Sequence, residues 1–175
     1  MSLKILRECS DFLEQSKGNP VYKTLISNGK DIRKVKVRKR KQEQHAFENI
    51  LDNAFQHTNI RQRGVFVAGN RKSLKVNSGM DIFYIFPVNG FKFVFSPTIT
   101  DTTSKTLSEE YKKFTDIMSE EEAVKSFTDL LSFSYTNENL EEAILSGNEI
   151  IVYGISHFYA VRESSIIDYN RVFGL

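Results

Sequence analysis

The chain has 175 residues, of which 40% are hydrophobic and 26% charged, and its formal net charge is +2. At roughly 150 residues per domain this is one domain, and the charged fraction is that of a globular protein rather than a disordered chain. The single cysteine, Cys9, excludes a disulfide framework and a zinc site built on several thiolates. No apolar run is long enough to cross a membrane, and the charged N-terminus is unlike a signal peptide. We therefore expect a protein that is neither secreted nor bound to a membrane.

The charge is unevenly distributed along the chain. Eight of the twelve residues from Lys30 to Lys41 are basic, whereas residues 107–145 contain ten Asp or Glu and three Lys. The basic segment predicts either contact with phosphates, of a nucleic acid or a dinucleotide, or a solvated strand or arm that docks on the protein's own acidic helices. The candidate phosphate contacts are Lys34, Lys36, Arg38 and Arg40. Val35 and Val37 alternate with charge as in a half-buried strand, so both interpretations stay open.

The first half of the chain predicts helices and short strands in alternation. An apolar stripe at helical spacing predicts a helix over residues 2–16, within an N-terminal helical segment 1–18 that ends before Pro20. Cys9 lies on this stripe, which favours a buried thiol over a nucleophile. The following segments are a β-prone run at 21–26, the basic arm or strand at 30–41, a helix at about 42–57, a buried strand at 64–68, and a helix or loop at 71–76.

Two turn signals mark the second half. The aromatic runs at 82–86 and 91–95 flank Val88-Asn89-Gly90, and Asn-Gly is the composition of a tight turn, so a β-hairpin is predicted there. Glu149–Tyr153 and His157–Val161 around Gly154 predict a second hairpin.

Between these pairs of strands, residues 107–146 form an acidic segment that predicts helices at 107–117, 119–132 and 137–146. Ser119 and Glu122 have the spacing of a capping box at the start of the middle helix. The order of elements predicts a single α+β domain over residues 1–175. We expect a mixed, mostly antiparallel sheet, which could be split into two small sheets, with helices packed around it.

One aromatic pattern admits a nucleic-acid interpretation. Gly90–Val94 resembles the strand of RNA-recognition domains whose exposed rings stack on bases, and Val65–Asn70 resembles its companion strand. The interval between the two is too short for the helix and strand that separate them in that fold. Phe91, Phe93 and Phe95 also alternate as a row facing a core does, which favours a structural role.

Three separated segments resemble the ADP-ribosyltransferases. Asn148–Val161 resembles the late strand of that family, which carries the catalytic Glu and is followed by apolar residues, a turn and an F-x-V strand. Pro20–Thr24 is similar to the early strand, with Lys23 where the family has Arg. Gly64–Asn70 is similar to the middle aromatic strand, with Ala68-Gly69 where Ser or Thr is usual. The acid that the family carries two residues before its catalytic Glu corresponds to Gly147, which argues against arginine as the acceptor.

The chain also resembles a protein family of tailed bacteriophages over about residues 20–161. The matching positions are His45, Arg61 or Arg63, Phe66, Gly69, Ile85-Phe86-Pro87, Phe91, Phe93, Ser96-Pro97 and Gly147-Asn148-Glu149-Ile150. This resemblance implies a viral protein of the host cytoplasm or the virion. It leaves a non-enzymatic structural or interaction protein, and a nucleic-acid-binding protein using the basic arm, as alternatives to an enzyme.

The resemblance to the ADP-ribosyltransferases implies the fold of that family and an enzyme that transfers ADP-ribose from NAD to a host protein or nucleic acid. Glu149 would be the catalytic carboxylate, hydrogen-bonding the ribose and stabilising positive charge on the sugar. The candidate NAD contacts are Lys23, His45, Arg63 and Phe66. Lys23 supplies charge without the bidentate geometry of Arg. No metal is expected, and other virion proteins are the partners that the structural alternative implies.

Overall fold

The computed structural model describes residues 3–39, 47–55, 60–101 and 104–166. In that part of the chain seven strands form one sheet in which every ladder is antiparallel. The strands are β1 (Tyr22–Ile26), β2 (Ile32–Lys36), β3 (Val65–Ala68), β4 (Met80–Pro87), β5 (Lys92–Phe95), β6 (Glu149–Tyr153) and β7 (His157–Arg162), in the order β2-β7-β4-β1-β3-β6-β5. The α+β prediction is confirmed, and the sheet is antiparallel throughout this part of the protein.

The sheet consists of two halves that meet at a single residue pair. Between β1 and β3 the ladder contains only Tyr22 opposite Ala68, whereas β1 and β4 pair over five residues. The four-strand half is β2-β7-β4-β1 and the three-strand half is β3-β6-β5. The strands therefore form one sheet with a weak seam, and the alternative of two separate small sheets is not what the structure has.

Both predicted hairpins are wrong, although their turns are real. Gly90 and Gly154 adopt φ values of +78° and +77°, a left-handed conformation that glycine tolerates best. The strands that flank each turn do not pair with each other: β4 lies in the four-strand half and β5 in the three-strand half, and β6 and β7 are divided in the same way. Each turn thus carries the chain from one half of the sheet to the other.

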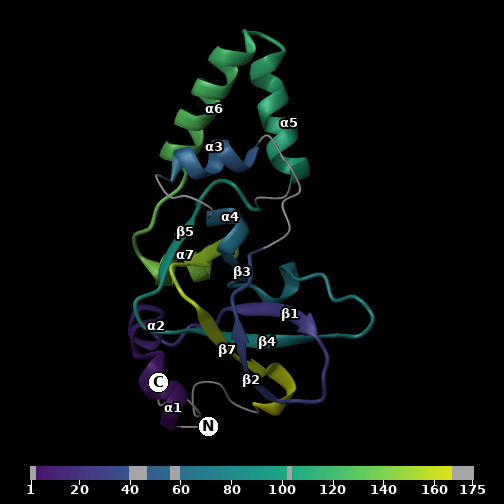
Figure 1. Ribbon diagram of the computed structural model, residues 1–175, viewed down its shortest axis with the longest axis vertical. Coiled ribbons are helices and arrows are strands. Elements are labelled where there is room, and N and C mark those ends of the chain that lie inside the picture. The colour runs from purple at the N-terminus through teal and green to yellow at the C-terminus, as the bar shows by residue number, and fades with distance from the viewer. Residues whose placement is uncertain (1–2, 40–46, 56–59, 102–103, 167–175) are drawn as a thin grey trace.

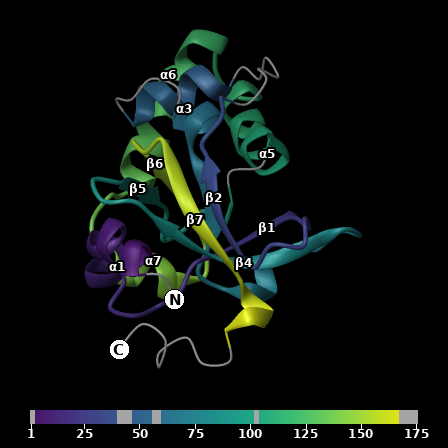
Figure 2. The same ribbon diagram turned by 60° about the horizontal axis from the view of Figure 1, so that its bottom comes forward.

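Most of the helices that the structure describes fall into two groups. The described helices are α1 (Leu3–Glu8), α2 (Ser10–Gln15), α3 (Phe47–Ala54), α4 (Ile60–Arg63), α5 (Ser104–Thr115), α6 (Glu120–Ser134) and α7 (Leu140–Ser146), with 3-10 turns η1 (Arg71–Ser73) and η2 (Glu163–Ser165). Helices α3, α5 and α6 form a helical cap at one end of the molecule (Figure 1), with its own apolar core around Phe127 and Leu131. Figure 2 shows α1 and α7 beside the strands, away from this cap. Their apolar residues join the main core against the sheet.

Helix α6 begins where the sequence predicts. Ser119 is its N-cap, and the Ser119 hydroxyl accepts a hydrogen bond from the Glu122 backbone N–H while the Glu122 carboxylate accepts one from the Ser119 backbone N–H. This reciprocal arrangement satisfies two donors that the helix itself leaves without partners. The capping box is confirmed.

The predicted N-terminal helix is broken at Cys9 into α1 and α2. Asn89, from the turn after β4, explains the break: its backbone and side-chain N–H groups donate to the carbonyls of Glu8 and Arg7, which a continuous helix would use itself. The Asn89 side-chain oxygen then accepts from the backbone N–H of Asp11 in α2. Cys9 is fully buried, and burial raises the pKa of its thiol to about 12, which agrees with an unreactive structural cysteine.

The aromatic strand that resembles an RNA-binding element faces the core. Phe91, Phe93 and Phe95 are all buried, and the first two pack against each other with ring centroids 6.4 Å apart. Stacking on bases needs exposed rings. The core interpretation of this row is therefore confirmed.

The basic segment forms an edge strand. β2 pairs with β7 alone, and along it Arg33 and Val35 are half-buried while Lys34 and Lys36 are exposed. The Arg33 guanidinium lies 4.0 Å from the centre of the Phe83 ring and donates a hydrogen bond to the Ile26 carbonyl. The half-buried strand is confirmed for the residues described, and its pairing partner is β7 rather than the acidic helices.

A hydrogen bond between Tyr159 and Glu8 fastens α1 to β7 and predicts a pH dependence. The hydroxyl donates to the carboxylate over 2.6 Å, which raises the pKa of Tyr159 to about 12 and lowers the pKa of Glu8. The free energy that the Tyr159 hydroxyl contributes to folding is fully present below its ordinary pKa of 10 and is lost as the pH rises to about 12. The free energy that the Glu8 carboxylate contributes is lost as the pH falls through the lowered pKa of that group. We expect Tyr159→Phe to lower the unfolding free energy at pH 7 and to flatten its fall between about pH 10 and 12. The unfolding free energy of both proteins is measured by denaturant titration at several pH values. The same fall of this free energy with rising pH in the two proteins would contradict the prediction.

Candidate functional site

A pocket of about 420 Å³ opens at the seam of the sheet, where β1 and β3 separate after their single pair. Its lining residues are Lys23, Thr24, Phe66, Val67, Ala68, Ser73, Leu74, Thr100, Asp101, Gly147, Asn148 and Glu149. All three segments of the predicted site contribute to it, although they lie far apart in the sequence. Small-molecule sites in proteins have volumes of about 300–1,000 Å³, so this pocket is within their range.

Lys23 bridges the seam. Its Nζ donates a hydrogen bond to the Phe66 carbonyl over 2.8 Å, so a side chain links β1 to β3 beyond the point where ladder bonds end. The residue is half-buried, which strengthens a charge-assisted bond relative to one in open water. Lys23 therefore links the two strands on either side of the pocket and also brings a positive charge to its wall.

Glu149 is held from both sides by backbone interactions. It is the first residue of β6 and pairs with Ala68, and its backbone N–H donates to the Thr100 carbonyl over 2.9 Å. Gly147 ends α7 in a left-handed conformation, with φ of +73°, and so turns the chain into this strand. The side chain of Glu149 is half-buried in the wall of the pocket.

The segment before β6 is tied to the loop after β5. The Asn148 side-chain amide donates to the carbonyls of Ser96 and Pro97, over 2.8 and 3.2 Å. The Ser96 hydroxyl in turn accepts from the backbone N–H groups of Thr98 and Ile99. These bonds fix the loop that supplies Thr100 and Asp101 to the pocket.

Asp101 is a pocket residue that the sequence reasoning missed. It brings a second carboxylate to the lining, and its Oδ1 accepts a hydrogen bond from the Thr106 hydroxyl. The signal in the sequence was the run SPTITDTTS after the last aromatic strand, a cluster of hydroxyl and acidic residues typical of a loop. Nothing in that run indicates which of its residues reaches the site.

The other predicted contacts lie elsewhere or outside the described residues. Arg63 is exposed on α4, next to the Val65 end of β3, whereas the pocket is at the Ala68 end. His45 and Arg40 lie outside the described residues. Lys34 and Lys36 on β2, with the exposed Arg38 after it, are separated from β1 by β7 and β4. The structure thus brings together Lys23, Phe66 and Glu149.

A second hollow of about 480 Å³ shares Gly147 with this pocket. Tyr22, Arg71 and Lys72 are among its lining residues, so its wall combines an aromatic ring with two cations. The Arg71 Nε is paired with the Glu163 carboxylate over 2.9 Å, and Lys72 is exposed. The two hollows adjoin at Gly147.

Within the ranges that the structure describes, no group of three His, Cys, Asp or Glu side chains is placed to hold a metal ion, and no helix is long and apolar enough to span a membrane. The charged groups that line the pocket are Lys23, Asp101 and Glu149.

Comparison of the chain with protein-family models, with curated proteins and with solved structures found no match.

Proposed function

We propose that the pocket at the seam binds NAD and that the protein transfers ADP-ribose from it to an acceptor, with Glu149 as the catalytic carboxylate. The observation that carries this proposal is the common pocket of Lys23, Phe66 and Glu149. These residues belong to the three segments that resemble the ADP-ribosyltransferases. A chance resemblance would not require the three to meet.

The chemistry assigns a role to each charged group. The bond between nicotinamide and the ribose carbon breaks, and its electron pair leaves with nicotinamide, so positive charge develops on the sugar before the acceptor attacks that carbon. A carboxylate at Glu149 stabilises this charge and accepts a hydrogen bond from the 2′-hydroxyl. Lys23 offers a cation to a phosphate or ribose oxygen, and the adjoining hollow, with Tyr22 and Lys72, accommodates the second half of the dinucleotide.

At two positions of the pocket the residue differs from the one that the ADP-ribosyltransferases carry, and both differences change which groups are available to hold NAD. Lys23 cannot form the two parallel hydrogen bonds of an Arg, because an ammonium is a point charge rather than a planar fork. Ala68 supplies no hydroxyl, and the hydroxyl side chains that line the pocket instead are Thr24, Ser73 and Thr100. We infer that these three replace the missing hydroxyl as ligand contacts.

Incubation with NAD labelled in its adenylate phosphate tests the proposal. Wild-type protein is expected to label a macromolecule of a bacterial lysate or to release nicotinamide. Glu149→Gln is expected to lower the rate by about 100-fold or more, since it removes the charge that stabilises the transition state.

Glu138→Gln is the matched control, because Glu138 is an exposed acid outside the pocket and the charge change is the same. Melting curves of both variants show whether they are folded. The catalytic proposal is abandoned if folded wild-type protein neither transfers label nor hydrolyses NAD, or if the Glu149 variant retains the wild-type rate.

A second candidate function rests on the basic edge strand. Lys34 and Lys36 project from one face of β2 and are exposed, as is Arg38 beyond it. We propose phosphate contact with nucleic acid along this edge. Retention on single- and double-stranded DNA at low salt is expected to fall steeply as salt is added, and to fall further in the double variant Lys34→Gln, Lys36→Gln. Absence of retention at low salt would exclude this function.

A further inference from the structure

We propose that a pocket in the helical cap, which shares Thr100 with the site at the seam, binds a small amphiphilic cation: an apolar ring system or branched chain that carries one ammonium or guanidinium group. The pocket has a volume of about 320 Å³ and lies between α5, α6 and the loop at residues 98–100. A cavity of about 150 Å³ is large enough for benzene, so this one has room for a fused pair of rings. Neither resemblance of the sequence assigns a role to it.

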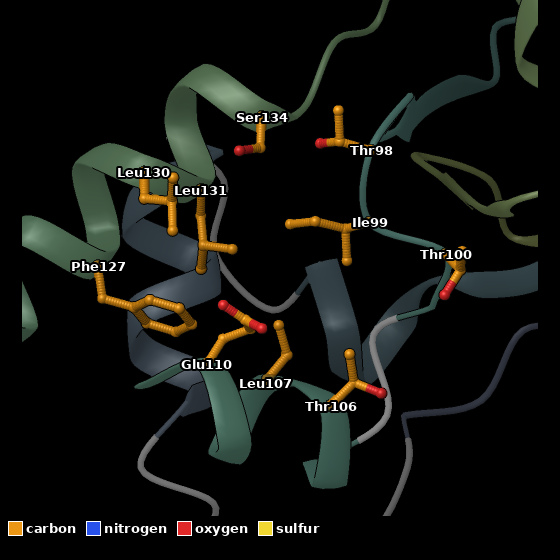
Figure 3. Close-up of a pocket in the computed structure, with 10 residues that line it drawn as sticks. All are labelled: Thr98, Ile99, Thr100, Thr106, Leu107, Glu110, Phe127, Leu130, Leu131 and Ser134. Carbon is orange, nitrogen blue, oxygen red and sulfur yellow. The ribbon is translucent and has the colours of Figure 1, made fainter. Parts of the chain in front are cut away.

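The inner wall of the pocket is apolar. Leu107, Phe127 and Leu131 are almost completely buried, and Figure 3 shows them, with Ile99 opposite, surrounding the central space. Leu130 also lines the pocket and is partly exposed. The three buried side chains have almost no surface in contact with water, so the area that an apolar ring would remove from water lies on Ile99, on Leu130 and on the ring itself, at roughly 25 cal/mol for each Å².

The charge of the ligand follows from Glu110. Among the described residues that line this pocket it is the one charged side chain, and in Figure 3 its carboxylate reaches from α5 toward the centre, near Phe127 and Leu107. Its Oε1 is paired with Lys113 over 2.6 Å, but the Lys113 side chain is 67% exposed. Pairs this exposed contribute little to stability and are readily exchanged. The Glu110 side chain is itself 42% exposed, so a ligand cation in the pocket would reach a carboxylate that a surface lysine holds only weakly.

The surroundings of the pocket also favour a cation. Residues 104–134, which include α5 and α6, contain seven acidic and four basic residues. A net negative field raises the local concentration of cations and lowers that of anions. Thr98, Thr106 and Ser134 line the pocket as well, and the hydroxyl oxygen of such a residue can accept a hydrogen bond from an ammonium.

The test compares 2-naphthylmethylammonium with its neutral isostere 2-naphthylmethanol. Binding is measured by calorimetry and by methyl NMR of Ile99, Leu107 and Leu131 at pH 7, without NAD. The ammonium compound is expected to bind at least about tenfold more tightly than the alcohol, and to shift those methyl signals. Glu110→Gln is expected to remove this advantage, whereas Asp129→Asn, an exposed acid on α6 outside the pocket, is expected to retain it.

Leu130→Arg provides an independent check, because it places a cation at the partly exposed lining without disturbing a buried residue. It is expected to weaken binding of the ammonium compound more than that of the alcohol, with an unchanged melting temperature. Equal affinities of the two compounds for wild-type protein would overturn the proposal. The proposal would also be overturned if Glu110→Gln left the affinity for the ammonium compound unchanged. It would be overturned as well if the methyl signals that shift belonged only to residues outside the pocket. None of these outcomes bears on NAD chemistry at Glu149.

Discussion

Replacement of Phe127 by alanine is expected to lower the unfolding free energy by about 3–5 kcal/mol, the range for removal of a fully buried aromatic side chain. Phe127 is 1% exposed and occupies the centre of the helical cap. Its ring lies 5.4 Å from that of Tyr111 and 5.7 Å from that of Phe114, so the variant leaves a void that these neighbours fill only in part.

Phe133→Ala is the matched control for this prediction. Phe133 is on the same helix but is 90% exposed, and the same chemical change there is expected to alter stability by no more than about 0.5 kcal/mol. Urea titrations followed by circular dichroism give both values. Similar losses in the two variants would mean that the packing of α6 against α3 and α5 is not as described.

The second large effect is expected at Gly69, the residue after β3. A Cβ atom added there would lie 1.9 Å from the Ile144 carbonyl oxygen of α7, so alanine must push the helix away from the strand. Overpacking of a rigid site costs about 1–3 kcal/mol or more in unfolding free energy. Because the atom that the new Cβ would meet is a backbone oxygen, which cannot rotate away, we expect a cost at the upper end of this range. Because α7 leads through Gly147 to Glu149, the displacement also moves the carboxylate relative to Lys23. We expect a loss of about 3 kcal/mol in stability, together with loss of NAD binding.

Gly29→Ala separates this steric effect from the general cost of replacing glycine. Gly29 has φ of +75°, but apart from its two chain neighbours no described residue has an atom within 4 Å of the position that an alanine Cβ would take, so the backbone conformation is what opposes alanine there. The expected cost is about 1–2 kcal/mol, with NAD binding intact. If Gly69→Ala were no more harmful than this control, the close contact between β3 and α7 would be refuted.

Local signals in the sequence predicted most elements but not the pairing of the strands. The capping box at Ser119 and the turns at Gly90 and Gly154 depend on neighbouring residues, and all three are present. Which strands pair depends on contacts between distant residues. Asn89 illustrates this: its side chain binds α1 and α2 rather than closing a hairpin, and the chain then continues into the other half of the sheet.

The same distinction applies to the site. Lys23, Phe66 and Glu149 were predicted from short segments that each carry a recognisable pattern, and the pocket contains all three. Asp101 has no such pattern, and the loop before it is held by hydrogen bonds to Asn148 and Glu149, which are distant in the sequence. Arg63, a candidate NAD contact that matches the pattern of the phage family, lies on α4 beyond the other end of β3 and is not among the residues that line the pocket.

The seam between the two halves of the sheet makes the size of the pocket easy to change during evolution. In an ordinary ladder the separation of two strands is set by backbone hydrogen bonds, at about 4.7–4.9 Å, whatever the side chains are. Beyond Tyr22 and Ala68, β1 and β3 are joined instead through the side chain of Lys23. We therefore expect a substitution at Lys23 to change the spacing of β1 and β3 without changing the ladders on either side of the seam. Related chains that diverge at Lys23 are thus expected to accept ligands of different width on one unchanged scaffold.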